Sequence, residues 1–144
     1  MKKIIYQTDL GVAVVTPAPW CEISIEQVAQ KDVPAGVPYS IVDALLVPED
    51  RTFRAAWEKS PSGIIINPDK AKAIWKDKWR AARNPILASL DIEFMKAVEA
   101  GDSAKQAEIA AHKQALRDVT QTEISGNSPD EIKAVWPQVL GEKQ

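Results

Sequence analysis

The sequence predicts an α+β protein, in which a small N-terminal unit containing a β-hairpin is followed by an α-helical hairpin and a short C-terminal helix. Two β-rich runs, residues 3–7 and 11–16, are separated by a short turn segment. Residues 75–119 carry apolar side chains at three- and four-residue spacing, which is the period of amphipathic helices. Ser128 and Pro129 then form a strong helix start.

Length and composition limit the class of protein. A chain of 144 residues is one ordinary domain, or a small domain with a helical appendage. The 18 basic and 20 acidic residues give a net charge of −2, which disfavours general attraction to nucleic acid or anionic lipid. Cys21 is the only cysteine, so an intramolecular disulfide is excluded and a reducing compartment is favoured. The start lacks the apolar segment of a signal peptide, and no run approaches the roughly 18 apolar residues of a membrane helix. We therefore expect a cytoplasmic protein without a membrane partner.

The front half contains further turn and cap signals. Pro17 and Pro19 end the second strand, because neither can donate a ladder hydrogen bond. Ser24 is the expected N-cap of a helix of about eight residues, with Gln27 completing a capping box. Residues 39–42 are the third predicted strand.

The predicted N-terminal unit ends with a short helix. Phe53 and Trp57 are four residues apart and would share one face of that helix, with acidic residues before it at its positive end. A Ser-Pro-Ser-Gly stretch follows. We therefore expect a small α+β unit over residues 1–60, a linker over 61–67, and the helical unit over 68–144.

The helical hairpin is the most prominent feature of the back half. Pro85 interrupts the first helix, and a proline in a helix interior costs about 3 kcal/mol, so we expect a kink or two helices end to end near Asn84. Gly101 and Asp102 supply a C-terminal stop and a new N-cap. The apolar stripe of the first helix comprises Trp75, Trp79, Ala82, Ile86, Leu90 and Phe94. The expected apolar face of the second helix comprises Ala107, Ala110, Ala111, Ala115 and Leu116.

Neither a catalytic set nor a metal site is predicted. His112 is the only histidine and is expected at the helix surface, and Cys21 is expected as a packing thiol without a basic partner. A structural zinc needs four ligands, which one Cys and one His do not supply. The six glycines form no phosphate-binding loop. The sequence therefore predicts a non-enzymatic protein with no cofactor and no metal.

A basic cluster precedes Asn84 and is opposed only by Asp77. Its members are Lys70, Lys72, Lys76, Lys78, Arg80 and Arg83. Because two tryptophans lie among these basic residues, such a helix could bind the phosphate backbone of a nucleic acid. The alternative is that the tryptophans belong to a core or interface and that the aliphatic stems of the basic residues cover its flanks. The sequence favours this second interpretation, with an acidic protein partner or the chain's own second helix opposite the cluster.

The string WRAARNPILASLD at residues 79–91 and the string KQALRDV at residues 113–119 resemble the tail-assembly chaperones and tail-fibre-associated proteins of tailed bacteriophages and prophages. The segments MKKIIYQTDLGVAVVTPAP, VPAGVPYSIVD and RTFRAAW are also similar to small proteins encoded among phage tail genes. Two positions depart from the family pattern, since Ile92 stands in place of a tryptophan and Thr120 in place of a proline.

The resemblance implies a non-enzymatic chaperone that binds and shields a phage tail or tail-fibre protein in the host bacterial cytoplasm. A permanent structural or adaptor component of the phage tail or baseplate is the alternative, and a nucleic-acid-binding regulator is the third class. Self-association into a homo-oligomer is also compatible with the hairpin. The expected partner-binding residues are Trp75, Trp79, Arg80, Arg83, Leu87, Asp91, Arg117 and Asp118. An intramolecular bridge from Arg83 or Arg80 to Asp118 is the other explanation of these charges.

Overall fold

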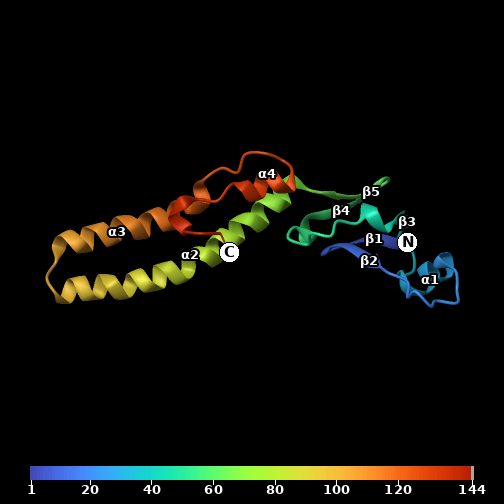
Figure 1. Ribbon diagram of the computed structural model, residues 1–144, viewed down its shortest axis with the longest axis horizontal. Coiled ribbons are helices and arrows are strands. Elements are labelled where there is room, and N and C mark those ends of the chain that lie inside the picture. Colours follow the sequence, from blue (N-terminus) through green and yellow to red (C-terminus); the bar gives the residue numbers. More distant parts are fainter. Residues whose placement is uncertain (144) are drawn as a thin grey trace. The chain divides into compact units, whose positions relative to one another are not determined.

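The computed structural model describes residues 1–143 and shows the predicted α+β class (Figure 1). The chain forms two compact units, Met1–Ala71 and a second unit that begins at Lys72. The first contains antiparallel strands and one helix, and the second contains the helical hairpin and a short C-terminal helix. Among the described residues, none of the helices combines the length and apolar character required to cross a membrane.

A three-stranded antiparallel sheet forms the centre of the first unit. Its strands are β1 (Lys2–Thr8), β2 (Gly11–Val15) and β3 (Tyr39–Asp43), in the order β2-β1-β3. The predicted β-hairpin is thus confirmed. Gly11 has φ +116°, and a Cβ atom at this position would lie 2.9 Å from the carbonyl oxygen of Arg54. Both the turn conformation and the close approach of Arg54 therefore require glycine here.

The first helix, α1 (Ile25–Asp32), has the predicted capping box. The Ser24 hydroxyl accepts from the Gln27 backbone N–H at 3.3 Å, and the Gln27 side chain accepts from the Ser24 backbone N–H at 3.0 Å. Val28 on α1 packs with Ile4 of β1 in a buried cluster. Helix α1 therefore covers one face of the sheet.

The prediction of a helix that carries both Phe53 and Trp57 is wrong. Residues Arg54–Ala56 form one 3₁₀ turn, and Trp57 begins strand β4 (Trp57–Ser60). Spacing of four residues is compatible with one helical face, but it is also compatible with two separate inward-facing positions. Both aromatic side chains are almost completely buried, at 2% and 0% exposure. Trp57 lies in a cluster with Ile5, so burial against the sheet takes precedence over the helical period.

The predicted linker at residues 61–67 is also wrong. Strand β5 (Gly63–Ile66) pairs antiparallel with β4, with Trp57 opposite Ile66 and Ser60 opposite Gly63. A run of β-branched isoleucines favours a strand, and the preceding Pro-Ser-Gly supplies its turn, with Gly63 at φ +136°. The division between the two units accordingly falls after Ala71.

A carboxylate on β4 gives the first unit a pH dependence. Hydrogen bonds from Lys70 Nζ and Asn67 Nδ2, both 3.0 Å from Glu58 Oε1, hold the pKa of Glu58 below its ordinary value of 4.5. A lowered folded-state pKa stabilises the protein above the ordinary pKa, and this contribution is lost as the pH falls through the folded-state value. We expect urea denaturation to show a steeper loss of stability between about pH 5 and about pH 3 for wild type than for Glu58→Gln. Identical pH profiles would rule out this contribution.

The second unit contains the predicted helical hairpin, made of α2 (Pro68–Glu99) and α3 (Ser103–Asp118). Gly101 adopts φ +67° in the turn, and the Asp102 side chain caps α3. The expected alternative of two helices end to end is wrong, because α2 is one helix with Pro85 inside it. Its ribbon changes direction near its middle, as expected where a proline removes a helical hydrogen bond (Figure 1).

The C-terminal helix α4 (Pro129–Ala134) follows the predicted cap, Ser128, whose side chain accepts from the Glu131 N–H. The residues after it contact α2. Trp75 Nε1 donates to the carbonyl of Val135 at 2.8 Å, and its ring meets that of Trp136 edge-on, with centroids 5.8 Å apart. These contacts fix the C-terminal segment on the first half of α2 within the second unit.

Candidate protein-interaction sites

The stripe predicted on α2 is buried or half-buried throughout, but the face of α3 that packs against α2 differs from the predicted one. On α3 the covered positions are Gln106, Ile109, Lys113 and Leu116, which recur at spacings of three and four. The alanines predicted for this face, Ala107, Ala110, Ala111 and Ala115, are all exposed, and only Leu116 of the predicted set is buried. Alanine has the highest helix propensity on any face of a helix, so its spacing does not identify the inward side.

Two polar side chains of α3 reach across the seam. Lys113 Nζ lies 2.5 Å from Asp91 Oδ1 and 5.5 Å from the ring centroid of Phe94, and only 16% of the Lys113 side chain is exposed. Gln106 Nε2 donates to the Ala97 carbonyl at 3.3 Å. Lys113 thus fills the seam with its aliphatic stem while its charge is paired.

Arg83 of α2 caps the C-terminus of α3. One of its guanidinium nitrogens donates to the carbonyls of Leu116 at 3.5 Å and of Arg117 at 3.1 Å. The last carbonyls of a helix have no partner inside the helix, and the negative end of the helix dipole favours a cation there. Arg83 therefore holds the hairpin together, and it does so through backbone carbonyls rather than through the Asp118 carboxylate considered from the sequence.

The tryptophans predicted to bind a partner are core residues. Trp75 is 4% exposed and Trp79 is 0% exposed. Leu87 is half-buried. The two tryptophans cannot present a free surface, because the fold of the second unit already covers them, whereas Leu87 keeps part of its surface exposed. The physical reason is that a large aromatic residue gains more from burial within its own chain than a surface position would allow.

The remaining predicted charges are exposed. Arg80 bonds to Asp77 on its own helix, and Asp118 accepts from Gln114 Nε2 at 2.9 Å. Arg117 is exposed as well. Neither Arg80 nor Arg83 bridges to Asp118. Arg80, Arg117 and Asp118 therefore remain exposed, and their side chains make no contact across the hairpin that the structure records.

If Arg83 caps α3, its replacement should destabilise the protein more than the replacement of an ordinary exposed arginine. We expect Arg83→Ala to lower the free energy of unfolding by about 1–3 kcal/mol, because partly buried carbonyls lose a charged donor. Arg83→Lys should lose less, since it keeps the charge but not the planar fork. The control Arg80→Ala breaks an exposed pair and should cost about 0.5 kcal/mol or less. Urea denaturation followed by circular dichroism measures all three, and equal losses for Arg83→Ala and Arg80→Ala would contradict the capping role.

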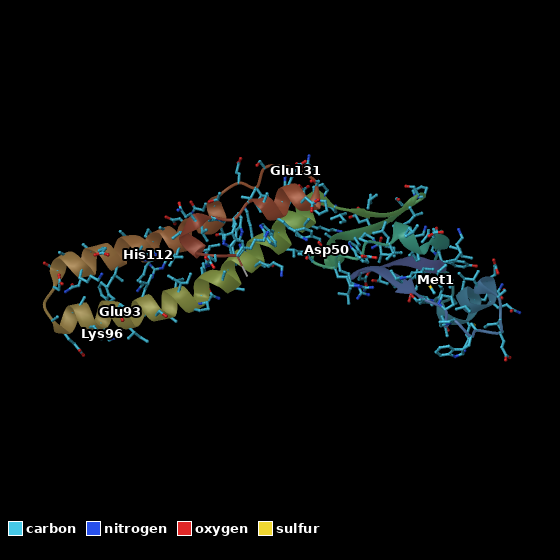
Figure 2. The ribbon with its side chains drawn as sticks, viewed as in Figure 1. Met1, Asp50, Glu93, Lys96, His112 and Glu131 are labelled. Carbon is cyan, nitrogen blue, oxygen red and sulfur yellow. The ribbon has the colours of Figure 1, made fainter. Side chains whose placement is uncertain are left out.

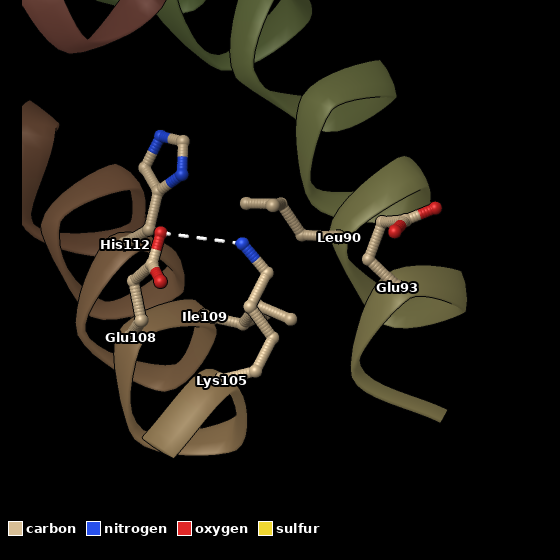
Figure 3. Close-up of a pocket in the computed structure, with 6 residues that line it drawn as sticks. All are labelled: Leu90, Glu93, Lys105, Glu108, Ile109 and His112. Carbon is tan, nitrogen blue, oxygen red and sulfur yellow. Dashed lines mark hydrogen bonds and ion pairs between the residues drawn. The ribbon is translucent and has the colours of Figure 1, made fainter. Parts of the chain in front are cut away.

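A shallow pocket of about 140 Å³ lies between α2 and α3 (Figure 3). Its lining residues are Leu90, Glu93, Lys105, Glu108, Ile109 and His112. Lys105 Nζ pairs with Glu108 at 3.3 Å (Figure 3). Glu93 pairs with Lys96, one turn further along α2, at 3.2 Å (both labelled in Figure 2). These charged groups are therefore paired along their own helices. His112 is exposed, as expected from the sequence. No group of three or more His, Cys, Asp or Glu side chains in residues 1–143 is arranged to hold a metal ion.

Large exposed apolar side chains occur in the segments that flank one end of the sheet in the first unit. Strands β2 and β3 are both antiparallel to β1, so both end beside the start of β1, where the Ala44 N–H donates to the Met1 carbonyl at 2.9 Å. The segments at this end carry five large apolar side chains that are 44–93% exposed. We call them the apolar sheet end: Met1, Trp20, Ile23, Leu45 and Leu46. Exposed apolar side chains that form a contiguous patch mark sites of protein binding, so these five are candidate contacts for a partner.

The apolar sheet end is not among the sites predicted from the sequence. Cys21 lies in the same segment and is exposed, so the predicted packing thiol is wrong. The available signal was the presence of Trp20 and Leu45 in segments marked as turns by proline and acidic residues. Leu10, which is 87% exposed in the β1–β2 turn at the opposite end of the sheet, provides an isolated apolar residue for comparison.

No protein-family model, curated protein or solved structure matches the chain. A functional proposal for this chain therefore starts from its own sequence and from the side chains that each unit exposes.

Proposed function

We propose that the protein is a non-enzymatic assembly chaperone of a tailed bacteriophage, which binds a tail or tail-fibre protein and shields it before assembly. The single observation that carries the proposal is the apolar sheet end, which exposes large side chains that a protein partner would cover. The resemblance of residues 79–91 and 113–119 to phage tail-assembly proteins supports the choice of partner.

The chemistry of the apolar sheet end suits an unassembled fibre chain. Such chains present unpaired strand edges and apolar stripes before they trimerise. Covering a fully exposed leucine contributes about 1.5–3 kcal/mol, and tryptophan is among the residues enriched in binding hot spots. Trp20 at 81% exposure and Leu45 at 93% exposure are thus the proposed anchors. In the second unit, we propose the exposed hairpin charges Arg80, Arg117 and Asp118 as a separate polar contact surface.

Affinity capture tests the proposal. The tagged protein is co-expressed with each tail and fibre protein encoded beside it, and captured chains are quantified. We expect wild type to retain one of these proteins and the double variant Trp20→Asp/Leu45→Asp to retain at least about tenfold less, because two anchors become charged. Leu10→Asp is the control, since it places one aspartate on a similarly exposed leucine at the other end of the sheet. Equal capture by all three proteins would contradict the proposal.

A further inference from the structure

Helix α2 is apolar on two opposite faces. Leu90, Phe94 and Ala97 face α3. A second set of positions recurs on the other side of α2 at alternating spacings of three and four, and every one of them is exposed. We call this set the outer row: Lys78, Ala81, Pro85, Ala88, Ile92, Met95 and Glu99.

The outer row has the pattern of a helix-pairing seam. Apolar residues at alternating spacings of three and four are the heptad signature of packed helices. An amphipathic surface helix has one apolar stripe, and a helix that is apolar on further faces is normally covered there as well. Helix α3 covers one side, while Ile92 remains 60% exposed and Met95 59% exposed. The sequence of α2 therefore provides for a second helix on this side.

The charges at the two ends of the outer row indicate which helix would pack against it. Lys78 lies at one end and Glu99 at the other, and neither belongs to an ion pair of the described chain. A second copy of α2 in the antiparallel direction would place each Lys78 beside the other copy's Glu99, as a two-fold axis requires. A parallel copy would place like charges together at both ends, which disfavours that arrangement.

The sizes of the side chains in the outer row also favour the antiparallel arrangement. When two copies of the row are antiparallel and centred on Ala88, Met95 faces Ala81 and Ile92 faces Pro85 of the other copy. Each large side chain therefore meets a small one, and alanine at the centre lets the helices approach closely. We propose that the outer row pairs two copies of this chain, antiparallel, around a two-fold axis at Ala88.

The size of the seam sets the expected affinity. At about 1.5 Å per residue the row is roughly 32 Å long, and it is a single helix wide. Such a contact falls at the small end of specific interfaces, so we expect a reversible dimer with a dissociation constant in the micromolar range. This inference is independent of the proposed function, because it depends on other residues and needs no partner protein.

Sedimentation equilibrium of the full chain measures the association. Between about 1 µM and about 500 µM, wild type should change from monomer to dimer. Ile92→Glu should be monomeric throughout, with unchanged helical circular dichroism because the position is exposed. Ala107→Glu adds the same charge to the exposed side of α3 and should dimerise as wild type does. A wild-type protein that stays monomeric, or an Ala107→Glu variant that loses the dimer, would overturn the proposal.

Charge reversal tests the direction of pairing. Lys78→Glu and Glu99→Lys should each weaken the dimer severalfold, because each leaves like charges together at both ends. The double variant Lys78→Glu/Glu99→Lys restores opposite charges only if the copies are antiparallel, and it should recover the wild-type dissociation constant. A double variant that dimerises no better than the single variants would overturn the antiparallel arrangement.

A cysteine at the two-fold axis gives an independent readout. In a Cys21→Ser background, Ala88→Cys places two thiols across the axis, within the distance range that a disulfide needs. Mild oxidation should then link the copies covalently, whereas Ala107→Cys in the same background should remain mostly unlinked. Equal cross-linking of the two variants would contradict a contact centred on Ala88.

Discussion

Replacement of Trp79 by alanine is expected to lower the free energy of unfolding by about 3–5 kcal/mol, the usual cost of deleting a large buried aromatic side chain. Trp79 is 0% exposed, and its indole N–H has no hydrogen-bond partner among the described residues. The loss is therefore one of packing and burial rather than of hydrogen bonding. Urea denaturation followed by far-ultraviolet circular dichroism measures it on the full chain.

Trp20→Ala is the matched control for Trp79→Ala. It removes the same atoms from a side chain that is 81% exposed, so its cost should be about 0.5 kcal/mol or less. Comparable losses for the two variants would show that Trp79 is not a core residue.

Gly11→Ala should destabilise the first unit by at least about 2 kcal/mol, because it combines backbone strain with a steric clash. The φ angle of +116° is unfavourable for alanine, and the new Cβ would lie 2.9 Å from the Arg54 carbonyl oxygen. Relief of that contact requires movement of the backbone around Arg54. The same urea denaturation measures the loss.

Gly36→Ala separates the two contributions. Gly36 has φ +80°, and a Cβ there would meet no described atom within 4 Å. This variant should therefore lose only the backbone contribution, of about 1 kcal/mol. A loss as large as that of Gly11→Ala would refute the role assigned to the Arg54 contact.

The elements predicted correctly are those with local signals. The Ser24 and Gln27 side chains cap α1, and Gly101 and Asp102 form the turn between α2 and α3, through contacts of only a few residues. Gly11 similarly marks the first β-hairpin. These hydrogen bonds and φ angles depend on residues that are close together in the sequence, so they can be predicted without knowledge of the tertiary fold.

The elements predicted wrongly depend on partners distant in sequence or on residues without directional preference. Trp57 forms a strand because Ile66 pairs with it and the sheet buries its ring, which the four-residue spacing from Phe53 does not reveal. The exposed alanines of α3 are compatible with every face of a helix. Residues 61–67 were predicted as a linker because the same residue types, proline, serine and glycine, occur in both linkers and tight turns.

The candidate site was only partly predictable. The charges of the hairpin were identified, but Arg83 caps a helix end, and such a contact is set by the packing of two helices. The apolar sheet end requires knowledge that β2 and β3 both end at the end of the sheet where β1 begins, which only the sheet topology supplies. Trp20 and Leu45 are 25 residues apart in sequence and gave no joint pattern.

The solubility of the partner protein tests the central claim most directly. The tail or fibre protein that the chain captures is expressed alone, with wild type, and with Trp20→Asp/Leu45→Asp, and its soluble fraction is measured after centrifugation. A chaperone that shields apolar surface should keep the partner soluble, whereas the partner alone or with the double variant should aggregate. A partner that is equally soluble in all three cases would contradict the shielding role.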